Sequence, residues 1–209
     1  MGTGQHRETN NINVFVNSRS RNCFGRLEEA RVNDFDAGID QSLDQRTAEL
    51  VAREAAVLGR EREAALAALK PVLEDASILK IGQNMKYDAK IFARNGVDVA
   101  PIDDTMLMSS ALFAGLHGHG MDTLSDTHLG HVPIPIKPLL GSGKSAITFD
   151  RVPLDKAVAY AAEDADVTLR LHLELWGRLQ SVPSLAKVLR EIEIPLVPVL
   201  ARIERNGAL

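Results

Sequence analysis

The chain has a single cysteine, few aromatic residues and no excess of positive charge. Cys23 has no partner for an internal disulfide, which is typical of proteins from reducing compartments. Aromatic residues make up only 4% of the 209 residues, so the core must be built mainly from Leu, Ala, Val and Ile. The formal net charge of −4 excludes a globally basic surface for nucleic acid. It remains compatible with an acidic metal site, because bound ions offset the charge of their ligands.

Long apolar runs are also absent. No stretch approaches the roughly 18 residues of a membrane span, and the polar N-terminus lacks the hydrophobic region of a secretory signal. We therefore expect a cytoplasmic protein that crosses no membrane. A hydrophobic fraction of 45% is typical of a soluble globular chain, and the length predicts one domain with an appendage.

The most strongly patterned stretch is residues 151–180, which we interpret as one helix opened by Pro153, because proline is tolerated in a first helical turn. Tyr160 and Asp164 lie four residues apart, so their side chains share one helical face. Glu163 and Asp166 flank them; taken alone, such a run is typical of a solvated acidic face. Apolar or small residues recur at helical spacing on the stripe that we expect to face the core: Leu154, Val158, Ala161, Ala165, Leu169, Leu173 and Trp176.

A second pair of polar residues has the same spacing. Residues 78–81 are mostly apolar and predict a buried strand, which Gly82 ends. Asn84 is a residue type that caps helices, and Asp88 follows it by four positions. We expect the two helices to offer these polar residues to one common site. Carboxylate oxygens are the natural ligands of Mg²⁺ and Mn²⁺.

The remaining elements are read from periodicity and from Gly and Pro positions. We predict strands at residues 12–16 and 97–100, and helices at residues 43–69, 87–95, 105–113, 122–129 and 185–206.

Two motifs carry a resemblance to a known family. Residues 83–88, Gln-Asn-Met-Lys-Tyr-Asp, resemble the second exonuclease motif of bacterial DNA polymerase I, Asn-x-x-x-Asp. Residues 160–168, Tyr-Ala-Ala-Glu-Asp-Ala-Asp-Val-Thr, resemble its third motif, Tyr-x-x-x-Asp. Residues 196–207 resemble the join to the polymerase domain. The likeness extends from about residue 65 to residue 209 and does not include residues 1–61.

The resemblance implies an α/β, ribonuclease-H-like 3′–5′ exonuclease domain at residues 62–183, lacking part of its sheet. Residues 1–61 would form a polar and then helical N-terminal extension, and residues 184–209 a helix like the start of a polymerase domain. The implied activity is hydrolysis of single-stranded 3′ ends of DNA with two Mg²⁺ or Mn²⁺ ions. No polymerase activity is expected from this chain.

The resemblance also assigns roles to the motif residues. Asp164 would be a direct ligand of one ion, Asp88 would hold the second, and Tyr160 would orient the attacking water, so these three are the expected catalytic residues. Four residues are expected to bind nucleic acid: Gln83, Asn84, Lys86 and Lys144, the last in a glycine-rich loop.

The first motif of the family, Asp-x-Glu on the opening strand, is missing. The strand-like residues 14–16 are followed only by Asn17 and Arg19, and the other candidate, Asp36, is followed by Gly38 where the Glu belongs. We therefore expect hydrolysis to be impaired.

Two alternatives remain open: a catalytically inactive nucleic-acid-binding module, or a truncated gene product. An incomplete sheet would further favour self-association through its exposed edge. Sequence alone does not decide between DNA and RNA, and the role of residues 1–61 stays open.

Overall fold

The computed structural model of the chain describes residues 14–17 and 62–207. Most of the predicted helix over residues 43–69, up to residue 61, therefore lies outside the described residues. Its last part is helical, in a helix that spans residues 62–73. The predicted strand near residue 14 is present as β1, Val14–Asn17.

A three-stranded parallel sheet lies at the centre, in the order β1-β2-β3, with β2 at Lys80–Gln83 and β3 at Ile102–Asp104. All four residues of β2 are buried, as expected for the middle strand of a sheet covered on both faces. Asn17 is in register with Gln83, and Gly82 with Asp104. Because the strands are parallel, their carboxyl ends meet at one edge of the sheet.

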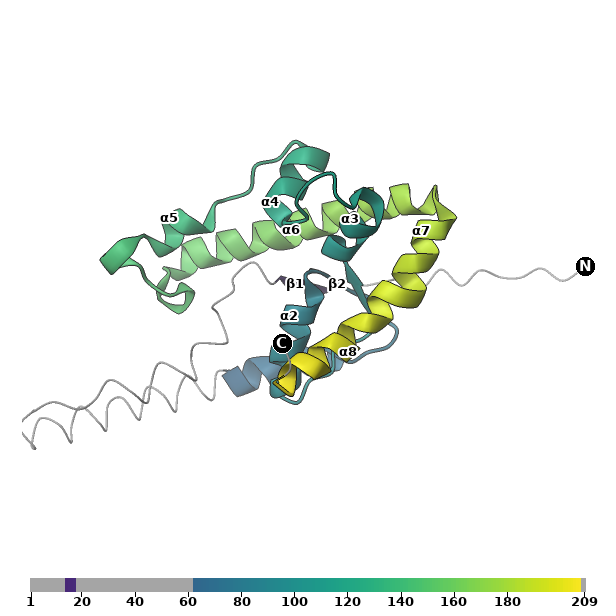
Figure 1. The fold of residues 1–209 in the computed structure, drawn as a ribbon. Helices are drawn as coiled ribbons and strands as arrows, with labels where there is room; N and C mark the ends of the chain where they lie inside the picture. Colours follow the sequence, from purple (N-terminus) through teal and green to yellow (C-terminus); the bar gives the residue numbers. More distant parts are fainter. Residues whose placement is uncertain (1–13, 18–61, 208–209) are drawn as a thin grey trace, which may run out of the picture.

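Helices cover both faces of this sheet. In Figure 1, α6 (Leu154–Gln180) crosses above the strands, and α2 (Met85–Arg94) and α8 (Ile194–Arg205) lie below them. α6 contacts β1 and β2, whereas α2 contacts β1 and β3. The predicted α/β class is confirmed, and the sheet is small in the described part of the chain.

One predicted strand was wrong. Residues 97–100 form no strand, and β3 begins two residues later, after Pro101. The backbone N–H groups of this segment bond elsewhere: Val97 donates to the Phe92 carbonyl and Ala100 to the Leu73 carbonyl. These bonds tie residues 97–100 to the neighbouring helices, so they cannot join the ladder.

The core gathers along α6. One cluster joins it to α3 (Thr105–Phe113) and to the π-helical turn η4 (Leu189–Glu193) through Met108, Leu175, Leu179 and Leu189. A second joins it to α4 (Met121–Leu124) through Met121, Leu124, Val167 and Leu171. Short turns follow α4: η1 (Ser125–Leu129), α5 (Ile136–Leu140), η2 (Gly143–Ser145) and η3 (Phe149–Arg151).

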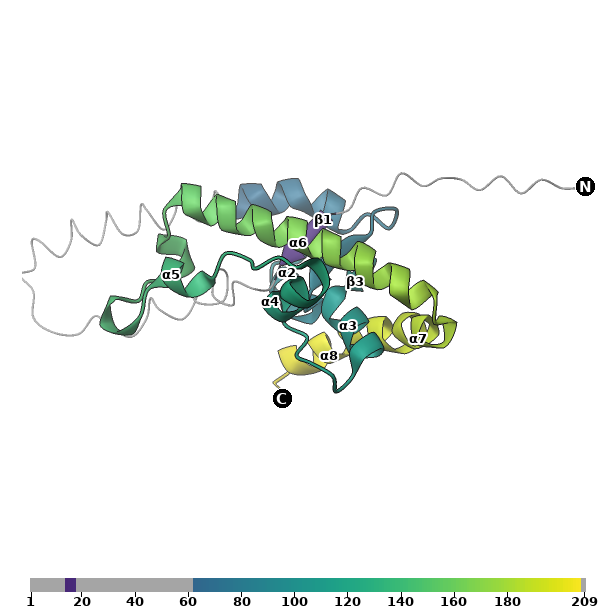
Figure 2. The ribbon, with the colours of Figure 1, turned by 90° about the horizontal axis from the view of Figure 1, so that it is seen from above.

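The C-terminal helices return along the domain. α7 (Pro183–Val188) and η4 contact α3, and α8 contacts α2. Figure 2 shows α5 and its loops beside the N-terminal half of α6, away from the sheet. Among the described helices, none is both long and apolar enough to cross a membrane.

Candidate active site

Helix α6 turns Tyr160 and Asp164 toward the interior, where they are 1% and 2% exposed. The prediction that they share one face is confirmed, but the predicted core stripe was wrong, because Leu154, Val158 and Leu173 are 78%, 57% and 62% exposed. Apolar residues recur on both faces of this helix, so their spacing alone does not fix which face is inside. The buried face consists of Tyr160, Asp164, Val167, Thr168, Leu171, His172, Leu175 and Leu179.

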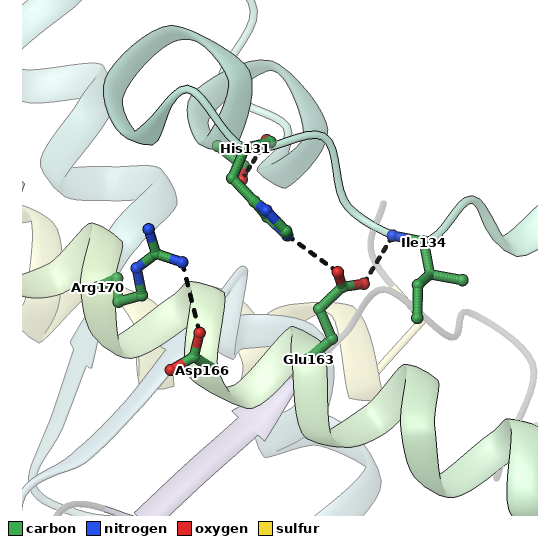
Figure 3. A network of polar contacts seen from close by, with 6 residues as sticks. His131, Ile134, Glu163, Asp166 and Arg170 are labelled. Atoms are coloured by element: carbon green, nitrogen blue, oxygen red, sulfur yellow. Dashed lines mark hydrogen bonds and ion pairs between the residues drawn. The ribbon is translucent and has the colours of Figure 1, made fainter.

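The acidic residues of α6 do not form one solvated face. Asp164 is buried, whereas Asp166 is exposed and forms an ion pair with Arg170 on the next turn. Glu163 reaches across to the loop before α5. Figure 3 shows these last two carboxylates directed to different partners, Glu163 to the loop and Asp166 to Arg170. Neighbouring acids on one helix therefore have separate roles.

Gln83 ends β2 and is 3% exposed. Its Nε2 donates to the backbone carbonyl of His119 at 2.8 Å, and its Oε1 accepts from the hydroxyl of Thr105. These internal partners hold the side chain between the start of α3 and the loop before α4. Its predicted contact with nucleic acid stays a prediction.

Asn84 precedes α2 in the left-handed conformation, with φ 63° and ψ 49°. Asparagine tolerates this conformation better than most residues do. Its side chain makes no capping hydrogen bond to α2, so the sequence-based expectation of a side-chain cap was wrong. The backbone N–H groups at the start of α2 instead donate to a side chain outside this helix.

The acceptor is Asp104, the last residue of β3, and this residue is 2% exposed. Its carboxylate accepts from the backbone N–H groups of Asn84 at 3.0 Å and Met85 at 2.8 Å. It also accepts from the N–H groups of Met106 at 2.8 Å and Leu107 at 3.4 Å. One side chain thus caps both α2 and α3. The sequence signal for α3 was present, because an Asp directly before an apolar run is a typical N-cap; the bond to α2 has no local signal.

Asp88 lies in the first turn of α2 and is 7% exposed. Its Oδ2 is buried and accepts no hydrogen bond from the described residues. Burial raises the pKa of Asp88 to about 7, and the nearby Asp104 carboxylate adds to the rise. Burial also raises the pKa of Asp104, against the effect of its four N–H donors. Asp88 is therefore a buried acid with one oxygen available to a ligand.

The two helices that carry the candidate carboxylates, α2 and α6, both contact β1. Its last residue, Asn17, is in register with Gln83 at the carboxyl edge of the sheet. Asp88 and Asp164 thus belong to two helices that contact the same strand. That the two carboxylates lie close together at one common site stays a prediction. The ring of Phe149 packs against Tyr160, with centroids 5.7 Å apart.

One of the two lysines expected to bind nucleic acid, Lys86, is engaged in an ion pair within the fold. Lys86 and the neighbouring Lys90 both bind the carboxylate of Glu204 on α8. These ion pairs lower the pKa of Glu204 to about 2. The backbone of Lys144 lies in η2, but its side chain is outside what the structure describes. Binding of nucleic acid by Lys86 and Lys144 stays a prediction.

Two buried carboxylates among the described residues suit a divalent ion. The open oxygen of Asp88 suits a hard cation, and the buried Asp164 supplies a second carboxylate. Within residues 14–17 and 62–207, no group of three or more acidic, His or Cys side chains is placed to hold a metal.

Comparison with known proteins gives the family. A family model for 3′-5′ exonucleases matches residues 37–180, and so begins within the segment 1–61. DNA polymerase I of Pseudomonas aeruginosa is 51% identical over 152 residues, covering 71% of this chain and 17% of that protein. DNA polymerase I of Rhizobium leguminosarum is 54% identical over 143 residues, covering 68% of this chain and 14% of that protein.

The fold is similar to that of Brucella melitensis NrnC, with a TM-score of 0.54 at 22% identity over 66% of this chain and 64% of that one. The chain spans about a sixth of the length of the curated relatives that it matches. It belongs to the 3′-5′ exonuclease family, as an exonuclease domain of the DNA polymerase I type.

Proposed function

We propose that this domain binds the single-stranded 3′ ends of DNA at the carboxyl edge of its sheet and hydrolyses them, with Mg²⁺ or Mn²⁺, far more slowly than a complete site would. One observation carries the reduced rate. β1 ends at Asn17, in register with Gln83, where the family resemblance calls for a carboxylate. A neutral amide brings no charge to a cation.

Divalent ions supply a clamp on the attacking and leaving oxygens in such reactions, with two ions roughly 3.5–4 Å apart. Asp88 and Asp164 would hold one ion here, with water completing the octahedral shell that Mg²⁺ requires. Among the described residues, no group of three or more acidic, His or Cys side chains is placed to hold a metal. Tyr160, fixed by burial beside Phe149, would keep its place on the same face of α6 as Asp164.

The rate penalty follows from the missing ligands. Metal clamping supplies several kcal/mol of barrier lowering, and each ~1.4 kcal/mol is tenfold in rate. Loss of a bridging carboxylate and its companion therefore costs on the order of a thousandfold or more.

The test restores one carboxylate. Asn17→Asp adds an acid at the end of β1, and Asn206→Asp adds the same charge at an exposed residue of the C-terminal end. Calorimetry with Mn²⁺ should show tighter binding for Asn17→Asp than for the wild type, and Asp164→Ala should bind more weakly. Digestion of a 5′-labelled single strand should be at least about tenfold faster in Asn17→Asp and unchanged in Asn206→Asp.

Two results would contradict the proposal. Equal Mn²⁺ affinity in Asp164→Ala would remove Asp164 from the site. Vigorous metal-dependent shortening by the wild type, lost in Asp164→Ala, would show that the site is complete, and Asp34 and Asp36, which lie outside the described residues, would be mutated next.

A catalytically inactive nucleic-acid-binding module is the alternative. It is favoured if both the wild type and Asn17→Asp bind the strand and neither shortens it. Self-association through the sheet stays a prediction: β1 and β3 are the outer strands of the described sheet, and light scattering over a concentration series would detect a dimer.

A further inference from the structure

Three histidine rings and one phenylalanine ring pack together beside the loop that joins α3 to α4. The ring of Phe113, the last residue of α3, stacks on His128 of η1 with centroids 4.9 Å apart, and it lies 5.3 Å from the ring of His117. The ring of His117 lies 5.5 Å from that of His128 and 5.6 Å from that of His119. None of these side chains has a part in the proposed hydrolysis.

The ring of His117 has a defined tautomer. Its Nδ1 lies 2.8 Å from the backbone carbonyl of Gly118, and because a carbonyl oxygen can only accept, Nδ1 carries the proton. In the neutral ring the lone pair is then on Nε2. Histidines that bind metals typically have this arrangement, in which one nitrogen donates to a carbonyl or carboxylate and the other faces the ion.

His117 and His128 each have a buried nitrogen without a partner. The Nε2 atoms of both rings are buried, and neither bonds to any group in the part of the chain that the structure describes. Burial, together with the charge of Arg178, lowers the pKa of His128, which favours its neutral ring. A buried polar atom without a partner costs stability, so these two nitrogens are suited to receive a ligand.

The spacing of the two rings suits one tetrahedral ion. Zn–N bonds of about 2.0–2.1 Å at tetrahedral angles place the ring centroids of two imidazole ligands roughly 5 Å apart. The centroids of His117 and His128 are 5.5 Å apart, with 63° between the ring planes. Phe113 packs against both rings and so restricts their rotation. The two rings are therefore held at the separation that two ligands of one ion need.

The surrounding charges permit a cation. Arg178 on α6 contributes positive charge near His128, but its guanidinium donates twice to the Glu174 carboxylate, at 2.6 and 2.8 Å, and this carboxylate acts on His128 in the opposite direction. Imidazole nitrogen suits Zn²⁺, Cu²⁺ and Ni²⁺, whereas Mg²⁺ prefers oxygen ligands. The two histidines therefore select a different class of ion from Asp88 and Asp164.

We propose that His117 and His128 bind one divalent transition-metal ion, of which Zn²⁺ is the representative, through their Nε2 atoms, with water in the remaining positions. The ion joins the loop before α4 to η1 and so fixes this loop. The His119 carbonyl, which accepts from Gln83 at 2.8 Å, belongs to the same loop. The site is independent of the proposed hydrolysis, because it uses neither Asp88 nor Asp164.

Calorimetry with Zn²⁺ in excess Mg²⁺ tests the site, because Mg²⁺ occupies oxygen ligands and leaves imidazole nitrogens free. His117→Gln and His128→Gln each remove one of the two protein ligands. Each should weaken Zn²⁺ binding at least about tenfold, since changes to the residues behind a ligand already cost about 10–100-fold. The imidazole NMR signals of His117 and His128 should shift when Zn²⁺ is added to the wild type.

Two controls separate this site from the rest of the molecule. His131→Gln changes a histidine whose ring lies 2.9 Å from the Glu163 carboxylate, and it should bind Zn²⁺ as tightly as the wild type. Asp164→Ala should also keep its Zn²⁺ affinity in excess Mg²⁺ while it loses affinity for Mn²⁺. Failure of Mn²⁺ to depend on Asp164 would overturn the proposed function and not this inference.

Thermal unfolding supplies a second measurement, because an ion that binds only the folded chain raises its melting temperature. Zn²⁺ should raise the melting temperature of the wild type and of His131→Gln, and much less that of His117→Gln. If one of the two ligand variants does not fold, the other decides. The inference is overturned if the wild type binds no Zn²⁺ in excess Mg²⁺, or if a folded His117→Gln or His128→Gln binds it as tightly as the wild type.

Discussion

Asp88 and Asp104 are both buried carboxylates beside the start of α2, and they differ in what their oxygens touch. Asp104 accepts four backbone N–H groups from the first turns of two helices. Asp88 has an oxygen that accepts nothing from the described residues. A carboxylate with many donors stabilises the fold, because the donors offset its desolvation. A buried carboxylate with a free oxygen costs stability and is available to bind a ligand.

The two residues also influence each other. The charge of Asp104 adds to the rise in the pKa of Asp88, so the structural acid makes the other one harder to ionise. A cation near Asp88 would remove that penalty. The difference between the two residues can be tested by removing each in turn.

The largest expected effect is the pH dependence due to Asp88. Its pKa is raised from 3.8 to about 7, so the folded protein retains a proton that the unfolded chain releases. The stabilisation is complete below the unfolded pKa and is lost as the pH rises through 7, by up to about 4 kcal/mol. Denaturant unfolding at about pH 5 and about pH 8 should show about 3 kcal/mol of this loss in the wild type and much less in Asp88→Asn. Parallel pH curves for the two proteins would show that Asp88 is ionised throughout.

Removal of Asp104 should have the next largest effect. Asp104→Ala leaves the first N–H groups of α2 and α3 without their acceptor, and we expect a loss of about 3 kcal/mol in the free energy of unfolding. Asp98→Ala, at an exposed loop residue, is the matched control and should change it by less than about 0.5 kcal/mol. Similar losses in both variants would mean that the double cap contributes little.

A smaller effect is expected for the carboxylate of Glu204, which binds Lys86 and Lys90 at the surface between α2 and α8. Glu204→Gln should lower the melting temperature less than Asp104→Ala does. The difference in melting temperature between Glu204→Gln and the wild type should become smaller at high salt. Because the pKa of Glu204 is lowered to about 2, this contribution is present at neutral pH and is lost as the pH falls toward 2. A salt-independent difference would point to packing rather than charge.

The smallest effect should come from Asp166, whose side chain is 63% exposed in its pair with Arg170. Asp166→Asn should change the free energy of unfolding by less than about 0.5 kcal/mol, because exposed ion pairs within one helix contribute little. Thermal unfolding measures it. A larger loss would mean that exposed acids contribute to stability as much as buried ones, against the comparison made here.

Local patterns predicted part of this site. The spacing of Tyr160 and Asp164 placed both on one face of α6, because an i, i+4 relation depends only on helix geometry. The extent of α6 and the presence of β2 also followed from residues close in the sequence. The side of α6 that is buried did not follow, because the helix carries apolar residues on both sides.

Partners far apart in the sequence could not be predicted. The bonds from Asn84 and Met85 to Asp104 depend on the pairing of β2 with β3. The contacts of Glu163 with His131 and Ile134 depend on the path of the loop before α5. The ion pairs of Glu204 depend on α8 packing on α2. None of these contacts joins residues at a fixed short spacing in the sequence. Each can therefore be recognised only in the three-dimensional structure.

The register of the sheet has a consequence for the order of folding. β2 and β3 pair through positions 80 and 102, whereas β1 pairs with β2 through positions 14 and 80. The entropic cost of closing a loop grows with the length of chain it contains, and distant pairings form slowly. The β2–α2–β3 unit, joined by Asp104, can therefore assemble from nearby contacts before β1 arrives. During synthesis from the N-terminus, the strand made first is the one whose pairing is completed last.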